Sequence, residues 1–277
     1  MKKYKNQPLS LLLYILVNLG ALITGAVVVF LIGYILYHGL PNLTLPGIFA
    51  WEYNAQNQSM MPAIINTLIT TALTLLLAVP IGVFAAIYLV EYSKKGSKLV
   101  SAIRLTAETL SGIPSIVYGL FGYIVFVITL GWSYTLLSGV ITLAIMILPL
   151  IMRTTEEALM AVPDSFREGS FGLGAGRLRT VFRIVLPSAV PGIAAGVILA
   201  IGRIIGESAA LIFTSGTNPV VAKGLFDSAS TLSVHLYALL TEGLYTNQAY
   251  AVATVLLFLV IGINALSSIA AKKLTAK

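Results

Sequence analysis

Long uncharged apolar runs alternate with short charged segments along the chain. No Lys, Arg, Asp or Glu occurs between Lys5 and Glu52, and none occurs between Glu52 and Glu91. A further 44 uncharged residues separate Glu108 from Arg153. A membrane-spanning helix needs about 20 mainly apolar residues, so this longest run holds two helices. The pattern predicts six spanning helices: about 9–37, about 62–90, two within 109–152 joined by a turn at 131–134, about 188–213 and about 247–271.

The composition agrees with a membrane protein built only of helices. The 277 residues are 58% apolar and 10% charged, whereas soluble domains carry about 25% charged residues. The absence of cysteine excludes disulfides and thiol catalysis. The first apolar run is too long for the core of a signal peptide, so we expect it to be retained. We expect two parts: residues 1–61, with one span and an external loop, and residues 62–277, with five spans and a cytoplasmic loop at 153–187.

The positive charges mark one side of the membrane. The 17 Lys and Arg residues outnumber the 10 Asp and Glu residues, which gives a net charge of +7. Arg203 lies within a predicted span and Lys223 on the opposite side, and the rest fall in alternate connections and at the termini. The positive-inside rule therefore predicts cytoplasmic termini. Charges spread over separate loops do not indicate nucleic-acid binding. The residues on the common side are Lys2, Lys3, Lys5, Lys94, Lys95, Lys98, Arg104, Arg153, Arg167, Arg177, Arg179, Arg183, Lys272, Lys273 and Lys277.

The connection between the fourth and fifth predicted spans contains a short amphipathic helix. Pro163 and Asp164 suit its first turn, and Ser165 with Glu168 has the spacing of a capping box. Such a helix fits a groove in a partner protein, although a helix lying on the membrane surface has the same pattern. The glycines that follow lack the spacing and context of a nucleotide-binding motif. Small or apolar residues occupy one face, at Phe166, Gly169, Ser170 and Leu173.

The same segment resembles the EAA motif of the permease subunits of binding-protein-dependent ABC importers. The family pattern E-A-A-x3-G-x9-I-x-L-P is matched at Glu168, Gly174, Ile184 and 186–187, with Gly-Ser in place of the two alanines. The resemblance implies that this loop forms a coupling helix that docks on an ATP-hydrolysing subunit. The residues that it assigns to this contact are Phe166, Glu168, Gly169, Ser170, Leu173 and Gly174.

Three further segments are similar to phosphate permeases of this family, namely Pro80–Tyr92, Gly112–Gly122 and Arg203–Ala209. The resemblance implies an all-α protein of the bacterial plasma (inner) membrane, with six spans in the type I (MetI-like) permease architecture. Its implied partners are a homologous permease, two cytoplasmic ATPase subunits, an external phosphate-binding protein and membrane lipid, but no nucleic acid. The ATPase subunits would bind ATP and Mg, so the chain itself is expected to be no enzyme and to hold no catalytic residue, cofactor or metal.

Two other functions stay open at this point. A permease of the same superfamily for sulfate or molybdate would have the same helices, because selectivity in these importers largely resides in the binding protein. A stand-alone secondary transporter would show inverted repeats and broken helices. No internal repeat is visible in the sequence, and the coupling pattern would then have no role.

Two charged residues lie inside the fifth predicted span. Arg203 and Glu207 are four residues apart, so on one continuous helix their side chains share a face. Charges within a span normally face a cavity or a partner, and the guanidinium of Arg203 suits an oxyanion. The two residues could line the translocation path or form a structural ion pair. Pro114 breaks the third predicted span, which makes Gly112 and Ser115 further candidates for the path.

Two other patterns concern helix packing. Arg104 and Glu108 have the same four-residue spacing at the cytoplasmic end of the third predicted span, where an interfacial ion pair is expected. Gly192–Gly196 and Gly202–Gly206 are small-x3-small pairs, which are typical of tight helix interfaces. Two pairs on one helix suit a seam with the second permease.

The longest external connection is expected at residues 214–246. It is expected to hold a short helix near 231–240, and it could cap a cavity, dock an external partner or simply run over the surface. His38 and His235 are both expected outside. Without a nearby cysteine or carboxylate cluster, they make a poor metal site.

Overall fold

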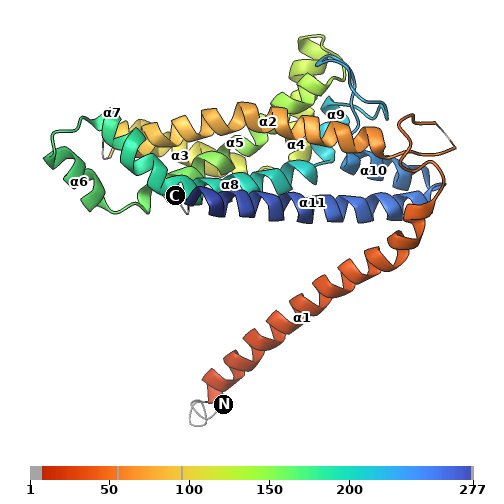
Figure 1. The fold of residues 1–277 in the computed structure, drawn as a ribbon, viewed down its shortest axis with the longest axis horizontal. Helices are drawn as coiled ribbons and strands as arrows, with labels where there is room; N and C mark the ends of the chain where they lie inside the picture. The colour runs from red at the N-terminus through yellow and green to blue at the C-terminus, as the bar shows by residue number, and fades with distance from the viewer. Residues whose placement is uncertain (1–7, 55, 95, 276–277) are drawn as a thin grey trace.

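The computed structural model describes residues 8–54, 56–94 and 96–275, and the regular elements in these residues are all helices (Figure 1). Lys2, Lys3, Lys5, Lys95 and Lys277, which contribute to the predicted charge asymmetry, lie outside the described residues. The α-helices are α1 (Pro8–Gly39), α2 (Met61–Ile87), α3 (Lys98–Ser111), α4 (Ser115–Gly122), α5 (Leu136–Met160), α6 (Asp164–Gly172), α7 (Arg177–Thr180), α8 (Leu186–Ile205), α9 (Ala209–Thr214), α10 (Leu232–Glu242) and α11 (Thr246–Thr275). The remaining elements are the 3-10 helix η2 (Leu40–Thr44) and the π-helices η3 (Tyr88–Tyr92), η4 (Tyr123–Thr129) and η5 (Val181–Val185).

The long helices support the prediction of six spans, one of them broken. By length and composition, five helical runs can cross a membrane: Leu9–Thr44, Met61–Tyr92, Leu136–Met160, Arg177–Ile205 and Thr246–Ile269. A sixth span results if α3 and the α4–η4 run count as one, with a bend of 101° between them. The predicted turn between the third and fourth spans is confirmed at Gly131 and Ser133, which both have positive φ.

The break in the third span follows from Pro114. Proline lacks an N–H and disfavours a helical conformation in the residue before it. Gly112 is the C-cap of α3, and α4 begins at Ser115 with Pro114 as its N-cap. The hydroxyl of Tyr118 donates a hydrogen bond of 2.8 Å to the carbonyl of Leu110, which ties α4 back to α3 across the break.

The centre of the bundle is α5, which packs between α2 and α8 (Figure 1). Leu143 and Ile147 of α5 belong to the largest buried apolar cluster. In a bilayer, helices associate through close packing, because lipid is as apolar as the side chains. Gly82 of α2 shows this packing, since a Cβ there would lie 2.7 Å from Cγ2 of Ile151. The α2–α5 pair is therefore a tightly interlocked unit.

The first glycine pair of α8 packs within this chain. A Cβ at Gly192 would lie 2.6 Å from Cβ of Ala158, and a Cβ at Gly196 would lie 2.1 Å from Oγ1 of Thr154; both neighbours are on α5. The prediction of a tight interface is confirmed for this pair, which packs on α5, whereas the suggested seam with a second permease stays a prediction. The second pair, Gly202–Gly206, makes no comparably close approach to another helix among the described residues.

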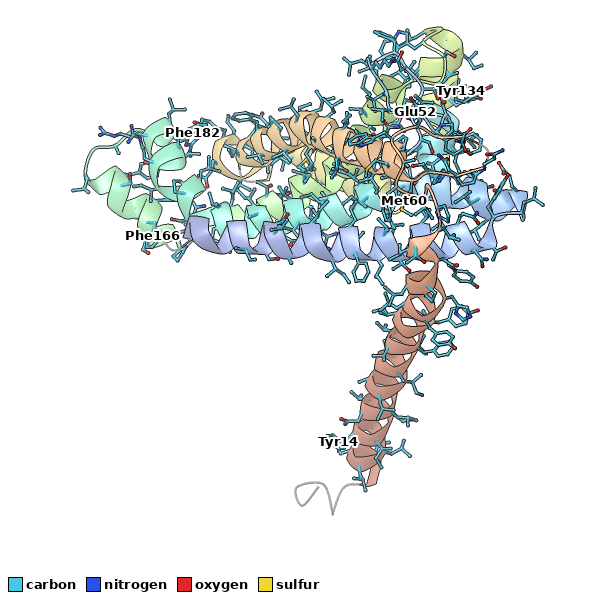
Figure 2. The ribbon with its side chains drawn as sticks, turned by 45° about the vertical axis from the view of Figure 1, so that its right-hand side comes forward. Tyr14, Glu52, Met60, Tyr134, Phe166 and Phe182 are labelled. Carbon is cyan, nitrogen blue, oxygen red and sulfur yellow. The ribbon has the colours of Figure 1, made fainter. Side chains whose placement is uncertain are left out.

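In contrast to α5, α1 stands apart from the bundle. It crosses α11 near its own C-terminal end and then diverges from the other helices (Figures 1 and 2). The crossing requires glycine at position 39, because a Cβ on Gly39 would lie 1.8 Å from Oγ1 of Thr254. None of the most apolar 18-residue window of α1 is buried by the rest of the chain. Lipid or another subunit therefore covers this helix in the membrane.

The side chain of Asn66, on α2, holds the long outer connection. Its Nδ2 donates hydrogen bonds to the carbonyls of Val220 at 2.9 Å and Ser230 at 3.2 Å. Its Oδ1 accepts a hydrogen bond of 3.0 Å from the N–H of Ala222. The short helix predicted near 231–240 is confirmed as α10, directly after this fastening. This one amide side chain therefore links α2 to three backbone groups of the segment that was predicted as an external connection.

His235 lies on the buried side of α10. Its ring lies edge-on to that of Tyr53, with the ring centroids 6.0 Å apart. Burial lowers the pKa of the His235 imidazole below its ordinary value, and a backbone hydrogen bond with Gln58 partly opposes this shift. The ring is therefore neutral at pH 7 and acts as part of the packing of the outer end.

Candidate functional site

The predicted amphipathic helix of the loop between the fourth and fifth spans is present as α6. Figure 1 shows it at one end of the bundle, opposite the outer connection. Asp164 lies in its first turn, and Pro163 is its N-cap. The predicted capping box is wrong, because Ser165 lies inside the helix and no side chain caps its N-terminus. The helix ends at Gly172, and Gly174 has a φ of 79°, a conformation that glycine adopts without strain.

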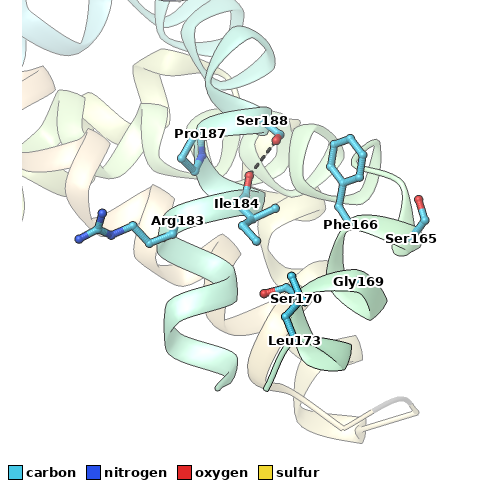
Figure 3. A pocket seen from close by; sticks show the side chains of 9 residues that line it. All are labelled: Ser165, Phe166, Gly169, Ser170, Leu173, Arg183, Ile184, Pro187 and Ser188. Carbon is cyan, nitrogen blue, oxygen red and sulfur yellow. Dashed lines mark hydrogen bonds between the residues drawn. The ribbon is translucent and has the colours of Figure 1, made fainter. Parts of the chain in front are cut away.

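One face of α6 turns toward the start of α8. Phe166, Gly169, Ser170 and Leu173 share this face, as predicted, and line a groove of about 590 Å³ together with η5 and the first turn of α8 (Figure 3). Ser170 is buried, and its Oγ lies 2.8 Å from Oγ1 of Thr180. The side chains of Phe166 and Leu173 are exposed. Exposed apolar side chains around an open groove form a surface that another protein can fill.

Arg167 attaches α6 to the rest of the bundle. Its guanidinium donates two hydrogen bonds to Oε1 of Glu91, from Nε at 3.1 Å and from Nη2 at 2.7 Å. It also donates to the carbonyls of Leu159 and Val162, at 2.9 and 2.8 Å, and to Oδ1 of Asp164 at 3.2 Å. Sequence patterns identify Arg167 only as a loop charge, because Glu91 lies 76 residues away and no local spacing points to it.

Glu168, the acid of the matched motif, has a different environment. It is exposed, and among the described residues it forms no hydrogen bond or ion pair. Gly174 lies beyond the helix and does not line the groove. Of the six predicted coupling residues, four therefore share the groove and these two lie beside it.

A second polar region lies between α3, α5 and α8. A cavity of about 580 Å³ is lined there by six charged residues, together with Ser111 and Thr154. The six are Arg104, Glu108, Arg153, Glu156, Glu157 and Arg203. Arg104 forms an ion pair with Glu156, and Arg153 forms one of 3.0 Å with Glu157. Arg203 makes no hydrogen bond or ion pair with another described residue, so its guanidinium is available to an anion in the cavity.

The predicted pairing of Arg203 with Glu207 is not formed. The fifth predicted span is not one continuous helix, because α8 ends at Ile205 and the chain turns at Gly206 before α9. Oε1 of Glu207 instead accepts a hydrogen bond of 3.0 Å from the N–H of Ala210, in the first turn of α9. A carboxylate satisfies the unpaired N–H groups at that helix end. The two charges therefore serve different helices.

The predicted pairing of Arg104 with Glu108 is also wrong. Arg104 reaches across from α3 to α5 and pairs with Glu156, whose side chain is buried. A buried carboxylate attracts a guanidinium more strongly than an exposed one, because the surrounding dielectric is lower. Glu108 stays on the cavity wall.

The remaining path candidates lie at helix breaks. Gly112 and Ser115 flank the break between α3 and α4, and neither lines the cavity, although the neighbouring Ser111 does. The structure therefore brings Arg203 together with the charged residues of α3 and α5, and not with Gly112, Ser115 or Glu207.

Comparison with known families identifies this arrangement. The family described as "binding-protein-dependent transport system inner membrane component" matches residues 78–276, well over half of the chain. The chain belongs to this family of permeases. The match begins in α2 and includes α6, the groove beside it and the polar cavity.

Curated relatives of this permease are similar over most of the chain. The probable ABC transporter permease protein YqgI of Bacillus subtilis is 35% identical over 244 residues, which are 82% of this chain and 82% of that protein. The phosphate transport system permease protein PstA of Mycobacterium leprae is 35% identical, over 73% of this chain and 67% of its own. PstA of Yersinia pestis is 37% identical, over 69% of this chain and 64% of its own.

Solved importer structures share the fold of this permease. One similar structure is a chain of a bacterial alginate ABC transporter, in complex with an alginate-bound periplasmic protein. The match covers 99% of this permease and 99% of that chain, with a TM-score of 0.66 and 19% identity. A chain of the MetNI methionine ABC transporter covers 77% of this permease and 93% of its own length, with a TM-score of 0.61 and 20% identity. The fold is the all-α, MetI-like architecture of ABC importer permeases. As a member of this family the permease is a multi-pass inner-membrane protein that works with an ATPase and a substrate-binding protein.

Proposed function

We propose that this permease is the PstA-like subunit of an ATP-driven phosphate importer. The observation that carries the proposal is the 35–37% identity with phosphate transport permeases over most of the chain. In this proposal, a homologous PstC-like permease completes the translocation path. Two PstB-like ATPase subunits supply energy from inside, and a PstS-like binding protein delivers phosphate from outside.

The groove-forming face of α6 is the proposed contact with the ATPase. Phe166, Leu173 and the small residues Gly169 and Ser170 offer an apolar, closely approachable surface, and the exposed Glu168 adds a charge beside it. ATP and Mg are bound by the ATPase subunits in this proposal, and the permease itself catalyses no reaction. Movement of the ATPases shifts α6, and the helix bundle then alternates between an inward-open and an outward-open state.

Arg203 is the residue proposed to meet the anion. A guanidinium donates paired hydrogen bonds to an oxyanion, and that of Arg203 faces the polar cavity without a partner among the described residues. We include Gly112, Ser115 and Glu207 in the path as secondary residues, because each lies at a helix break where backbone groups require polar neighbours.

The same proposal sets the orientation. The loop with α6 faces the cytoplasm, where ATP is available, and the outer connection faces the binding protein. In Figure 1, the last turns of α11 lie toward the same end of the bundle as α6, and α1 runs from the outer end obliquely back in that direction, apart from the bundle. Both termini are then cytoplasmic, as the positive-inside rule predicts.

Reconstitution of the four-component complex in liposomes tests the substrate. We expect uptake and ATP hydrolysis that depend on the binding protein loaded with phosphate, and little response to sulfate or molybdate. Preference for sulfate or molybdate would assign the permease to a related oxyanion importer. Uptake without any ATPase subunit would favour a stand-alone transporter.

Co-purification tests the contact with the ATPase. Leu173→Asp places a charge on an exposed apolar position of the groove face and is expected to abolish retention of the ATPase by the permease. Leu244→Asp is the matched control, because Leu244 is similarly exposed but lies at the outer end, after α10. Retention of the ATPase by Leu173→Asp would place the docking surface elsewhere.

A further inference from the structure

We propose that Arg167 is a positioning residue through which α6 moves the second span as well as the fifth. We use the name clamp for four residues: Arg167, Glu91, Leu159 and Val162. The inference rests on the proposed function of α6 as the coupling helix. It adds a second route for the movement, beside the continuous backbone that leads from α6 through η5 into α8.

Arg167 uses every donor of its guanidinium, four of them within the clamp and the fifth on Asp164. Arginine carries five N–H donors in a rigid fork. In Arg167, Nε and one N–H of Nη2 bind Glu91, and the other N–H of Nη2 binds the carbonyl of Leu159. The two N–H groups of Nη1 bind the carbonyl of Val162 and a carboxylate oxygen of Asp164. Saturation of this kind fixes the side chain relative to the ends of two spans at once.

Burial makes the clamp stiff. Only 15% of the Arg167 side chain and 8% of the Glu91 side chain are exposed. Glu91 lies in η3, at the C-terminal end of the second span, where the helix dipole disfavours a negative charge. Among the described residues, Arg167 is the only cation within ion-pair distance of Glu91. The carboxylate of Glu91 therefore depends on α6 for its compensation, so displacement of α6 pulls on the second span.

A second contact reinforces this attachment. The guanidinium carbon of Arg177, in α7, lies 5.8 Å from the ring centroid of Tyr92 in a cation–π arrangement. Glu91 and Tyr92 are adjacent at the end of the second span; the arginine partner of Glu91 lies within α6, and that of Tyr92 begins the next helix, α7. The end of the second span therefore contacts both the coupling helix and the helix that follows it.

The second span passes the movement to the centre of the bundle. Gly82 of α2 packs directly against Ile151 of α5, and Leu159 of the clamp is itself the second-last residue of α5. Interlocked helices move as a body, because packed interfaces resist continuous deformation. The clamp thus delivers the shift of α6 to the α2–α5 pair, while the backbone route delivers it to α8, which carries Arg203.

The ratio of ATP hydrolysed to phosphate transported tests the clamp in the reconstituted four-component complex. Arg167→Lys retains the charge but has only three donors and no fork, and Glu91→Gln removes the charge but retains every carbonyl contact of Arg167. We expect each variant to assemble with the ATPase and to hydrolyse several times more ATP per phosphate than the wild type. Because both substitutions break the same Arg167–Glu91 contact, the double variant should hydrolyse no more ATP per phosphate than the more affected single variant. Arg179→Lys, an exposed arginine of α7 with no ion pair among the described residues, is the control and should keep the wild-type ratio.

The outcomes separate the two proposals. Absence of phosphate uptake by the wild-type complex overturns the proposed function. Uptake by the wild type, with an unchanged ratio in Glu91→Gln, overturns the clamp alone. If Arg167→Lys fails to assemble, Glu91→Gln decides, since it leaves Arg167 bound to Leu159 and Val162. Multiplicative defects in the double variant also count against the clamp, because they show that the two residues act separately.

Discussion

Arg167 and Arg203 are both arginines in or beside the apolar bundle, yet their surroundings are opposite. All five donors of Arg167 are occupied by protein groups. Arg203 has no hydrogen bond or ion pair to another described residue, and it faces a polar cavity. A saturated guanidinium has nothing left to offer a ligand, whereas an unoccupied one in a cavity can bind an anion without first breaking an internal bond. The comparison therefore separates the residue proposed to transmit the movement of α6 from the residue proposed to meet the anion.

Two further arginines fall between these extremes. Arg104 pairs with the buried Glu156, and Arg153 pairs with Glu157, with both partners largely exposed. The four arginines form a series in which the side chain is the same but the hydrogen bonds and ion pairs that it makes with protein groups differ. Substitution of each one should thus affect transport and stability in different proportions.

The largest effect is expected at Arg203. Arg203→Ala removes the proposed anion donors, and two hydrogen bonds to a charged group are worth about 1.5–3 kcal/mol each. Since 1.4 kcal/mol is a factor of ten, phosphate uptake should fall by about 100-fold or more. The thermal stability of the purified complex should stay unchanged, because no internal bond is lost. Arg203→Lys should retain part of the uptake. Normal uptake by Arg203→Ala at normal expression would remove Arg203 from the path.

The second-largest effect is expected at Arg167. In contrast to Arg203, its loss should lower the stability of the permease. Arg167→Ala leaves the carboxylate of Glu91 buried without a cation, and breaking a buried ion pair costs about 3–5 kcal/mol. Unfolding of the permease in a denaturing-detergent titration should reveal this loss. Arg179→Ala, at an exposed position of the same loop, should change stability by no more than about 0.5 kcal/mol. An equal, small effect of both substitutions would show that the clamp is not a stabilising contact.

A smaller effect is expected at Arg104. Its side chain is half exposed, so water compensates part of the loss, but Glu156 is left buried. Arg104→Gln should therefore destabilise the permease by about 1–2 kcal/mol, less than a fully buried pair. A double-mutant cycle with Glu156→Gln measures the coupling between the two. If Glu108→Gln instead shows the coupling to Arg104, then Arg104 pairs with Glu108 along α3, as expected from the sequence, and not with Glu156.

The same series shows where sequence reasoning succeeds. Uncharged runs locate the spans, and the spacing of small and apolar residues locates the face of α6, because both patterns depend on neighbours within one helix. Arg203 is recognisable as a charge inside a span. These features need no knowledge of how helices lie against each other.

Contacts between distant segments are not visible in such patterns. The i, i+4 spacing pairs Arg203 with Glu207 only if the helix continues, and the chain instead breaks at Gly206 so that Glu207 can serve the start of α9. The partner of Arg167 lies 76 residues away, at the end of another span. Pairings of this kind follow from tertiary packing, which decides which helix ends meet.

The smallest effect is expected at Arg153, and it marks the exposed end of the series. The side chains of Arg153 and Glu157 are 63% and 59% exposed, and they are four residues apart on α5. Pairs of this type contribute about 0.3–0.5 kcal/mol, and salt screens them. Arg153→Gln should therefore leave stability almost unchanged in 0.5 M salt and lower it only slightly in dilute buffer. If Arg153→Gln reduced phosphate uptake as strongly as Arg203→Ala while stability stayed normal, then Arg153 would leave Glu157 to bind the anion, and engagement in an ion pair would not be enough to exclude an arginine from the path.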